Sequence, residues 1–184
     1  MLLNNDKILK NNFENYKNLF REIRIPAKSI LLNEGEIAHK IFFIKEGCIR
    51  MGFYNKGRDI TFQFFFENMP VASIESFLSN QPGQFFLESL EPSVLYCLNK
   101  KDFERIIRET PELKEYLNKL FFSRFERYSK LFLSFIRDTP EERYLELLKN
   151  EPHILQRVPQ HYIASYLGIT PVSLSRIRKI LSTK

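Results

Sequence analysis

The apolar residues of this 184-residue chain change their spacing once, and this change limits the possible folds. Between residues 23 and 98 they alternate at a period of two, as from Ile49 to Phe53, which is typical of short strands. From about Asp102 onward they recur every three or four residues, which is typical of amphipathic helices. The chain therefore predicts an α+β protein in which a β-barrel of jelly-roll type precedes a helical part.

Turn residues punctuate the strand region at short intervals. Gly35 and Gly47 lie where hairpins must turn, and the stretch 55–57, Asn-Lys-Gly, predicts a tight hairpin turn. The alternation places Arg50 and Gly52 on the face opposite to their apolar neighbours.

Three Thr-Pro pairs mark the starts of helices, at 110–111, 139–140 and 170–171. In each pair the hydroxyl can cap the helix and the proline suits its first turn. We expect a shorter helix over 102–109. A further short amphipathic helix is expected over 7–20, with its apolar side formed by Ile8, Leu9, Phe13, Tyr16 and Leu19.

The helix expected from Pro111 to about Arg137 is unusually long and carries two apolar stripes. One stripe is aromatic, with spacings of four, three, four and three, and predicts a dimer interface. It comprises Phe121, Phe125, Tyr128, Phe132 and Phe135. The second stripe, which can face the barrel, comprises Leu113, Leu117, Leu120 and Leu131. The alternative is that both stripes are buried within one subunit. Asp138-Thr139 is then the natural hinge between two halves of the chain. The N-terminal half is called the sensor half, and the C-terminal half is called the reader half.

Basic charge is concentrated at the C-terminus. The last 29 residues contain five Lys or Arg and no Asp or Glu, whereas the whole chain has a net charge of +6. The same segment has the pattern of a helix-turn-helix: Ala164 is small enough for a close helix crossing, and Gly168 suits the turn. Thr170 and Pro171 suit the start of the second helix.

The second helix sorts its residues by face. Leu174, Ile177 and Leu181 share an inward stripe, while Val172, Arg176, Lys179 and Thr183 share the opposite one. An outward face with Arg and small residues is what a major-groove reader requires. The predicted DNA-binding residues are Val172, Ser173, Ser175, Arg176, Arg178 and Lys179. A solvated basic helix at the end of an ordinary domain is the alternative interpretation.

Other classes of protein fit the composition poorly. The N-terminus lacks the apolar run of a signal peptide, and no stretch reaches the length of a membrane span. Cys48 and Cys97 lack metal-ligand spacing, and together with the missing export signal they indicate a reducing cytoplasm. The three histidines, His39, His153 and His161, are scattered, and no nucleophile, phosphate-loop or metal motif accompanies them. We therefore expect no enzymatic activity and no metal site.

A barrel, a long helix and a helix-turn-helix in this order resemble the Crp/Fnr family of bacterial transcription regulators along essentially the whole chain. The most specific part is the tail RVPQHYIASYLGITPVSLSRIRKIL, which resembles the DNA-binding motif of wingless, Bacteroidetes-type members. The resemblance implies a cyclic-nucleotide-binding-like sensor domain over 1–110, a dimerisation helix over 111–137 and a DNA-binding domain over 138–184.

The ligand segment departs from the family pattern. Relatives that bind cyclic AMP have a Phe-Gly-Glu-Leu stretch and, about ten residues later, an Arg that neutralises the phosphate. Here Val71-Ala72-Ser73-Ile74 stands at the first position, and Gly83, Gln84 and Phe85 stand near the second, where no positive charge occurs. The degenerate ligand pocket is predicted to comprise Ala72, Ser73, Ile74, Glu75, Gly83, Gln84 and Phe85.

No cofactor is expected. Cyclic AMP is not expected to bind in the family manner, Glu75 is interpreted as a helical surface residue, and two cysteines do not suit the four-cysteine iron–sulfur cluster of oxygen sensors. His39 is the candidate axial ligand for a haem sensor, and an ordinary loop histidine is the favoured interpretation.

The sequence therefore predicts a dimeric, cytoplasmic transcriptional regulator that binds double-stranded DNA. RNA polymerase and a small-molecule effector are further candidate partners, and no membrane partner is expected. The alternative function is a ligand-binding sensor or adaptor that acts through protein partners, with the basic tail as its docking surface.

Overall fold

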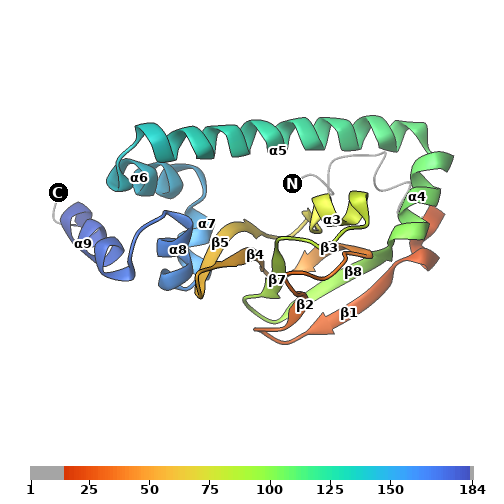
Figure 1. The fold of residues 1–184 in the computed structure, drawn as a ribbon, viewed down its shortest axis with the longest axis horizontal. Helices are drawn as coiled ribbons and strands as arrows, with labels where there is room; N and C mark the ends of the chain where they lie inside the picture. The colour runs from red at the N-terminus through yellow and green to blue at the C-terminus, as the bar shows by residue number, and fades with distance from the viewer. Residues whose placement is uncertain (1–14, 183–184) are drawn as a thin grey trace. The chain divides into compact units, whose positions relative to one another are not determined.

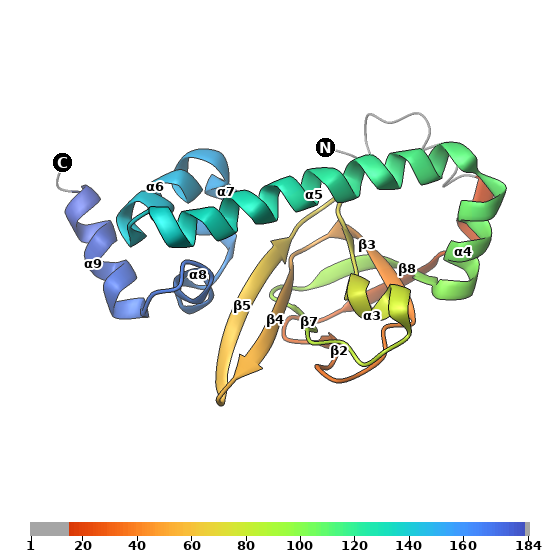
Figure 2. The same cartoon turned by 45° about the horizontal axis from the view of Figure 1, so that its top comes forward.

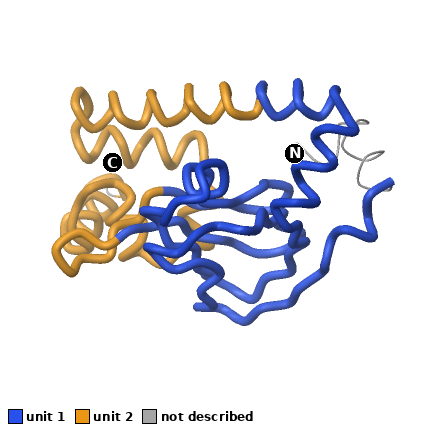
Figure 3. Tube along the Cα trace, turned by 45° about the vertical axis from the view of Figure 1, so that its right-hand side comes forward, with its two compact units in different colours: residues 1–53, 63–119 blue, residues 54–62, 120–184 orange. Residues whose placement is uncertain are grey.

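The computed structural model describes residues 15–182, so Ile8, Leu9, Phe13 and Thr183 lie outside the described part. The chain forms two compact units, shown in different colours in Figure 3. Unit 1 comprises residues 1–53 and 63–119, and unit 2 comprises residues 54–62 and 120–184. The units therefore divide inside the long helix, and unit 2 takes in nine residues of the strand region.

Two four-stranded sheets contain the described strands (Figure 1). In one sheet the strand order is β1(Arg21–Ile25), β8(Ser93–Asn99), β3(Lys40–Glu46) and β6(Pro70–Val71). In the other it is β2(Ile30–Leu32), β7(Phe86–Ser89), β4(Ile49–Asn55) and β5(Arg58–Phe65). In the described part, helical residues 15–16 and the 3₁₀ turn η1(Lys17–Leu19) precede β1. The predicted α+β architecture with a jelly-roll-like barrel is confirmed.

The strands β4 and β5 form a long hairpin, clearly visible in Figure 2. Only Lys56 and Gly57 connect them, and both have positive φ, at 51° and 75°. Two successive residues of positive φ match the right-handed twist of the flanking strands. The predicted tight turn is therefore confirmed, and Gly35 and Gly47 also have positive φ.

In this hairpin the polar residues that alternate with apolar ones are buried as well. Arg50 alternates with apolar neighbours in β4, as Thr61 and Gln63 do in β5, and all three are buried. Such strands are covered on both faces, so a polar residue between apolar ones does not indicate a solvent-facing side. The period of two correctly predicted the strands, but it did not show that both faces of these strands are covered by other residues.

Helices follow the strands where the sequence predicts them. In unit 1, α3(Ile74–Ser79) lies between β6 and β7, and α4(Lys100–Glu109) follows β8. The long helix α5(Pro111–Arg137) has the bounds expected from its pattern. The remaining helices, all in unit 2, are α6(Pro140–Asn150), α7(Pro152–Arg157), α8(Gln160–Tyr166) and α9(Pro171–Ser182). The short helix α7 was not predicted.

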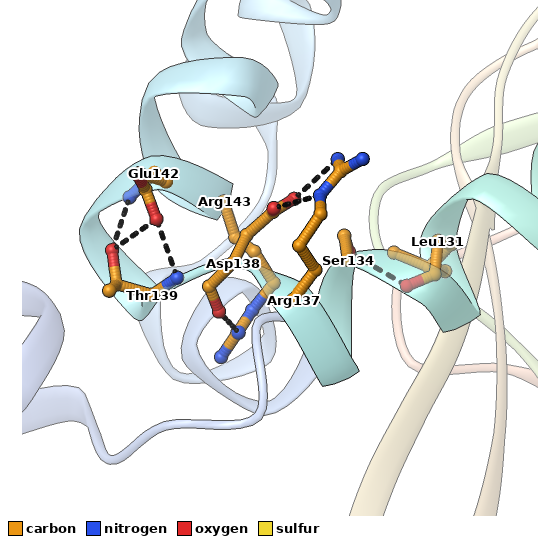
Figure 4. A network of polar contacts seen from close by, with 7 residues as sticks. All are labelled: Leu131, Ser134, Arg137, Asp138, Thr139, Glu142 and Arg143. Carbon is orange, nitrogen blue, oxygen red and sulfur yellow. Dashed lines mark hydrogen bonds and ion pairs between the residues drawn. The ribbon is translucent and has the colours of Figure 1, made fainter.

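The corner between α5 and α6 is closed by a capping box (Figure 4). The backbone N–H of Glu142 donates to Oγ1 of Thr139, and the backbone N–H of Thr139 donates to the Glu142 carboxylate at 2.7 Å. Two orphan donors of the helix start are thereby satisfied. The Thr-Pro pair at 139–140 thus caps α6 as predicted.

Candidate nucleic-acid interface

The turn between α8 and α9 has the hydrogen bonds of a Schellman motif. The backbone N–H of Gly168 donates to the carbonyl of Ser165 at 3.0 Å, and that of Ile169 donates to the carbonyl of Ala164 at 2.9 Å. Gly168 has a φ of +70°, the left-handed conformation that ends a helix in this way. The predicted helix-turn-helix turn is confirmed, and Ala164 is fully buried at the helix crossing.

Thr170 caps the start of α9, as expected. Its Oγ1 accepts a hydrogen bond from the backbone N–H of Ser173 at 3.1 Å and lies 2.9 Å from the Ser173 hydroxyl. Because the cap satisfies a donor at the start of α9, the first turn of this helix is held in place. Ser173, a predicted phosphate contact, thus shares its hydroxyl with the cap.

The two faces of α9 differ as predicted. Leu174 is buried and Ile177 and Leu181 are half-buried, so this stripe packs inward. The predicted DNA-binding residues are all exposed: Val172, Ser173, Ser175, Arg176, Arg178 and Lys179. The arrangement offers a rigid helix face with cationic side chains. Contact of these residues with DNA stays a prediction.

Arg143 of α6 joins two helix ends. It donates through Nη1 to the carbonyl of Asp138, at the end of α5, at 2.6 Å (Figure 4), and it also donates to the carbonyl of Leu167 at the end of α8. Its guanidinium lies 4.8 Å from the centre of the Phe135 ring. The cation therefore satisfies orphan carbonyls of two helices and lies against an aromatic face.

A second arginine connects α5 with the start of α7. Arg127 donates through Nη2 to both oxygens of Glu151, each at 2.7 Å. Burial by itself lowers the pKa of Arg127, but the Glu151 carboxylate and Tyr166 outweigh it, so the pKa is raised above its ordinary value. Burial raises the pKa of Tyr166. This network holds the reader helices on the second part of α5.

The tip of the β4–β5 hairpin belongs to the same unit and contacts α8. The backbone N–H of Thr61 donates to Oγ of Ser165 at 2.9 Å, and that hydroxyl lies 3.4 Å from the carbonyl of Asp59. The rings of Phe62 and Tyr128 lie 5.3 Å apart. No local sequence signal predicts these contacts, because their partners are far apart in the chain.

The predicted dimer residues divide into two groups. Tyr128 packs on Phe62 of its own chain, and Phe135 lies beside Arg143. Phe121, Phe125 and Phe132 remain exposed, and so does Phe135, at 43%. Part of the aromatic stripe predicted from the sequence therefore packs against other residues of the same chain. The dimer interface itself stays a prediction.

In unit 1 the structure brings the predicted ligand-segment residues together around α3. Oε1 of Glu75 accepts hydrogen bonds from the Ser73 hydroxyl at 2.7 Å and from the backbone N–H of Gln84 at 3.2 Å. A Cβ at Gly83 would lie 2.8 Å from the Ser73 hydroxyl, so only glycine fits without a shift. Ala72 is buried, Ile74 and Phe85 are half-buried, and Glu75 is exposed, as a helical surface residue should be.

Residues 22–110, which span both sheets together with α3 and α4, match the family model of the cyclic nucleotide-binding domain. This part of the chain is similar to a cyclic nucleotide-binding domain. The matched region runs from β1 to the end of α4 and includes the departures at Ala72, Ser73 and Gln84.

Several solved structures have a similar fold, and this similarity covers more of the chain than residues 22–110. The regulator CLP of Xanthomonas campestris, described as responsive to c-di-GMP, has a TM-score of 0.78 at 14% identity, covering 95% of this chain and 92% of its own. FixK2 of Bradyrhizobium japonicum has a TM-score of 0.76 at 16% identity, covering 89% and 85%.

A Crp/Fnr-family protein of Eubacterium rectale has a TM-score of 0.74 at 15% identity, covering 94% and 83%. No curated protein matches the chain. The expected resemblance to Crp/Fnr regulators is thus confirmed, and it extends over nearly the whole fold.

One charged pair inside the matched region, residues 22–110, was not predicted from the sequence. Arg50 of β4 lies directly opposite Glu88 of β7 in the sheet register, and the two form a buried ion pair. The ligand segment lacks a positive charge, but its neighbouring strand supplies one. The two residues are 38 positions apart, and only the strand pairing shows that they meet.

Within residues 15–182, no helix has the length and apolar character needed to cross a membrane. In the same part of the chain, no three His, Cys, Asp or Glu residues are grouped so that they would hold a metal ion.

Proposed function

We propose that this protein is a sequence-specific, DNA-binding transcriptional regulator that works as a homodimer in the cytoplasm. The observation that carries the proposal is the exposed cationic face of α9, held by the Schellman turn and the Thr170 cap. A helix so presented, with basic charge confined to its end of the chain, suits major-groove binding. In this proposal the chain has three parts: a sensor domain over 1–110, a dimerisation helix over 111–137 and a reader domain over 138–184.

Each side chain of the reader has its own role. Arg176 pairs with a guanine edge through its two guanidinium nitrogens, and Val172 contacts a thymine methyl group or packs on a sugar. Ser173, Ser175, Arg178 and Lys179 contact phosphates and set the register.

An exposed apolar stripe on α5 supports the homodimer. It comprises Phe122, Phe125, Phe132 and Ile136, whose separations of three, seven and four residues place them on one helix face. Phe125 and Phe132 are 71% and 66% exposed, which is unusual for aromatic side chains on a helix without a partner. A second copy of the same helix has the matching heptad pattern. Dimerisation places two reader helices about 34 Å apart, in successive major grooves of a near-palindromic site.

The barrel is proposed not to take cyclic AMP in the family manner, because Gln84 stands near the position of the phosphate-binding arginine. RNA polymerase and a small-molecule effector of another kind are proposed partners. Without an effector requirement, the DNA-competent arrangement is populated in the ligand-free protein.

In vitro selection from random DNA duplexes with the purified, ligand-free protein tests the function. We expect enrichment of a near-palindrome whose half-sites lie about one helical turn apart. Salt-dependent binding without any sequence preference would contradict a reader and would favour a basic docking surface for a protein partner. Repeating the selection with cell extract detects an effector requirement.

A further inference from the structure

The barrel contains a positive charge that lies outside the segment from Ser73 to Phe85. The side chain of Arg50 is 2% exposed, and its guanidinium lies 4.8 Å from the centre of the Phe86 ring. It donates through Nε at 3.2 Å and Nη2 at 2.6 Å to a single oxygen, Oε2 of Glu88. A buried guanidinium is costly unless an anion neutralises it, so Arg50 demands an anionic partner at this place.

This charge lies on the strand that pairs with β7, and β7 follows the ligand segment in the chain. Strand β7 begins directly after Gln84 and Phe85, and Phe86 and Glu88 are alternate residues that share one face of the strand. In the register, Gly52 pairs with Phe86 and Arg50 pairs with Glu88. A positive charge is absent near Gln84 but occurs opposite Glu88, four residues further along the chain, on the neighbouring strand. The anion that contacts Arg50 is the carboxylate of Glu88, a residue of the same chain.

A second buried polar side chain lies on the next strand of the sheet. Gln63 of β5 is 4% exposed, and its Nε2 donates to the carbonyl of Phe64 at 3.0 Å. Its Oε1 has no hydrogen-bond partner among residues 15–182. An unsatisfied buried acceptor is unfavourable, so this position of the interior requires a hydrogen-bond donor such as a water molecule.

We propose that the barrel contains an anion-binding site built on Arg50, that Glu88 occupies this site, and that Glu88 thereby excludes phosphate-bearing ligands such as cyclic nucleotides. An incoming phosphate must displace the carboxylate from the guanidinium and leave it without this partner. Desolvation makes that exchange unfavourable. The inference deepens the proposal that the barrel does not take cyclic AMP in the family manner, and it is independent of DNA binding.

Calorimetric titration of the full chain with cyclic AMP and with inorganic phosphate tests the inference. The wild type should show no saturable binding of either probe. The variants Glu88→Gln and Glu88→Ala should bind inorganic phosphate saturably, at least about tenfold more tightly than the wild type. Each variant leaves the buried guanidinium of Arg50 without its carboxylate partner, and phosphate can then neutralise it. The double variant with Arg50→Met and Glu88→Ala is the matched control and should lose the gain.

The outcomes separate the inference from the proposed function. Tight cyclic AMP binding by the wild type overturns both the cyclic AMP proposal and the role of Glu88. A cooperatively folded Glu88→Gln variant that gains no phosphate binding overturns the inference alone. If thermal unfolding shows that neither Glu88 variant folds, Glu88 serves the fold rather than selectivity, and the inference is wrong.

Discussion

The guanidinium of Arg143 donates through both Nε and Nη2 to the carbonyl oxygen of Leu167, at 3.3 and 3.0 Å. Leu167 is the C-terminal cap of α8, where the helix leaves carbonyls without partners of their own. The same guanidinium serves the carbonyl of Asp138. One side chain of α6 therefore anchors the end of α5 and the start of the reader turn.

Replacing Arg143 should weaken this unit. Arg143→Met leaves two carbonyls without their donor, and we expect the free energy of unfolding to fall by about 1–3 kcal/mol. Urea unfolding followed by circular dichroism measures the change. The control is Arg137→Met, since Arg137 is 77% exposed and should change stability by less than about 0.5 kcal/mol. Equal effects of the two variants would argue against the anchoring role.

Gly168 is required for its backbone conformation and for its closeness to Phe135. A Cβ at this position would lie 2.8 Å from Cε1 of the Phe135 ring, at a φ of +70°. Gly168→Ala should cost more than about 1 kcal/mol of unfolding free energy, because conformational strain and a steric shift both contribute. Gly57→Ala is the matched control: its φ is +75°, but no atom lies within 4 Å of the added Cβ. Thermal unfolding should show the larger loss for Gly168→Ala.

The capping box at α6 should make stability depend on acidic pH. Hydrogen bonds from the backbone and hydroxyl of Thr139 lower the pKa of Glu142 below its ordinary value. Because the folded-state pKa lies below the unfolded one, this contribution is fully present above the unfolded pKa. It is lost as the pH falls through the folded pKa. Urea unfolding between pH 7 and pH 3 should show the difference between wild type and Glu142→Gln shrinking with acidification. A constant difference would contradict the assignment.

Two cationic residues of α9 should have separable effects on DNA binding. Arg176→Ala should weaken binding to the selected site by roughly 1–3 kcal/mol and relax the preference at one base pair. Lys179→Ala should weaken all sequences alike and reduce the salt slope by about one. Titrations against matched and single-mismatch duplexes at several salt concentrations measure both. If Arg176→Ala leaves affinity and preference unchanged, Arg176 does not read a base.

Dimerisation should depend on the exposed stripe of α5. Phe125→Glu and Phe132→Glu each place a charge where an apolar side chain is to be buried, and burial of a Phe contributes about 2–3 kcal/mol. The dimer dissociation constant should rise at least about a hundredfold. Sedimentation equilibrium measures it, with Leu145→Glu as the control, since Leu145 is exposed on α6 and outside the stripe. A wild-type monomer would rule out the homodimer.

Local patterns predicted much of this fold because the interactions behind them are local. The Thr139 and Thr170 caps, the turn at Gly57 and the bounds of α5 each depend on residues a few positions apart. The inward stripe of α9 followed from helical periodicity alone. The short helix α7 was missed, although Pro152 occupies its first turn.

The sequence by itself determined that a strand region precedes a helical region, and it determined the helix-turn-helix and the charge of its outer face. Only the tertiary structure decided that Arg50 meets Glu88 and that Thr61 meets Ser165, across 38 and 104 positions of chain. It also decided that Tyr128 packs on Phe62 of its own chain while Phe125 and Phe132 stay exposed. Periodicity shows which residues share a face of an element, whereas the partner of that face depends on long-range packing and strand register.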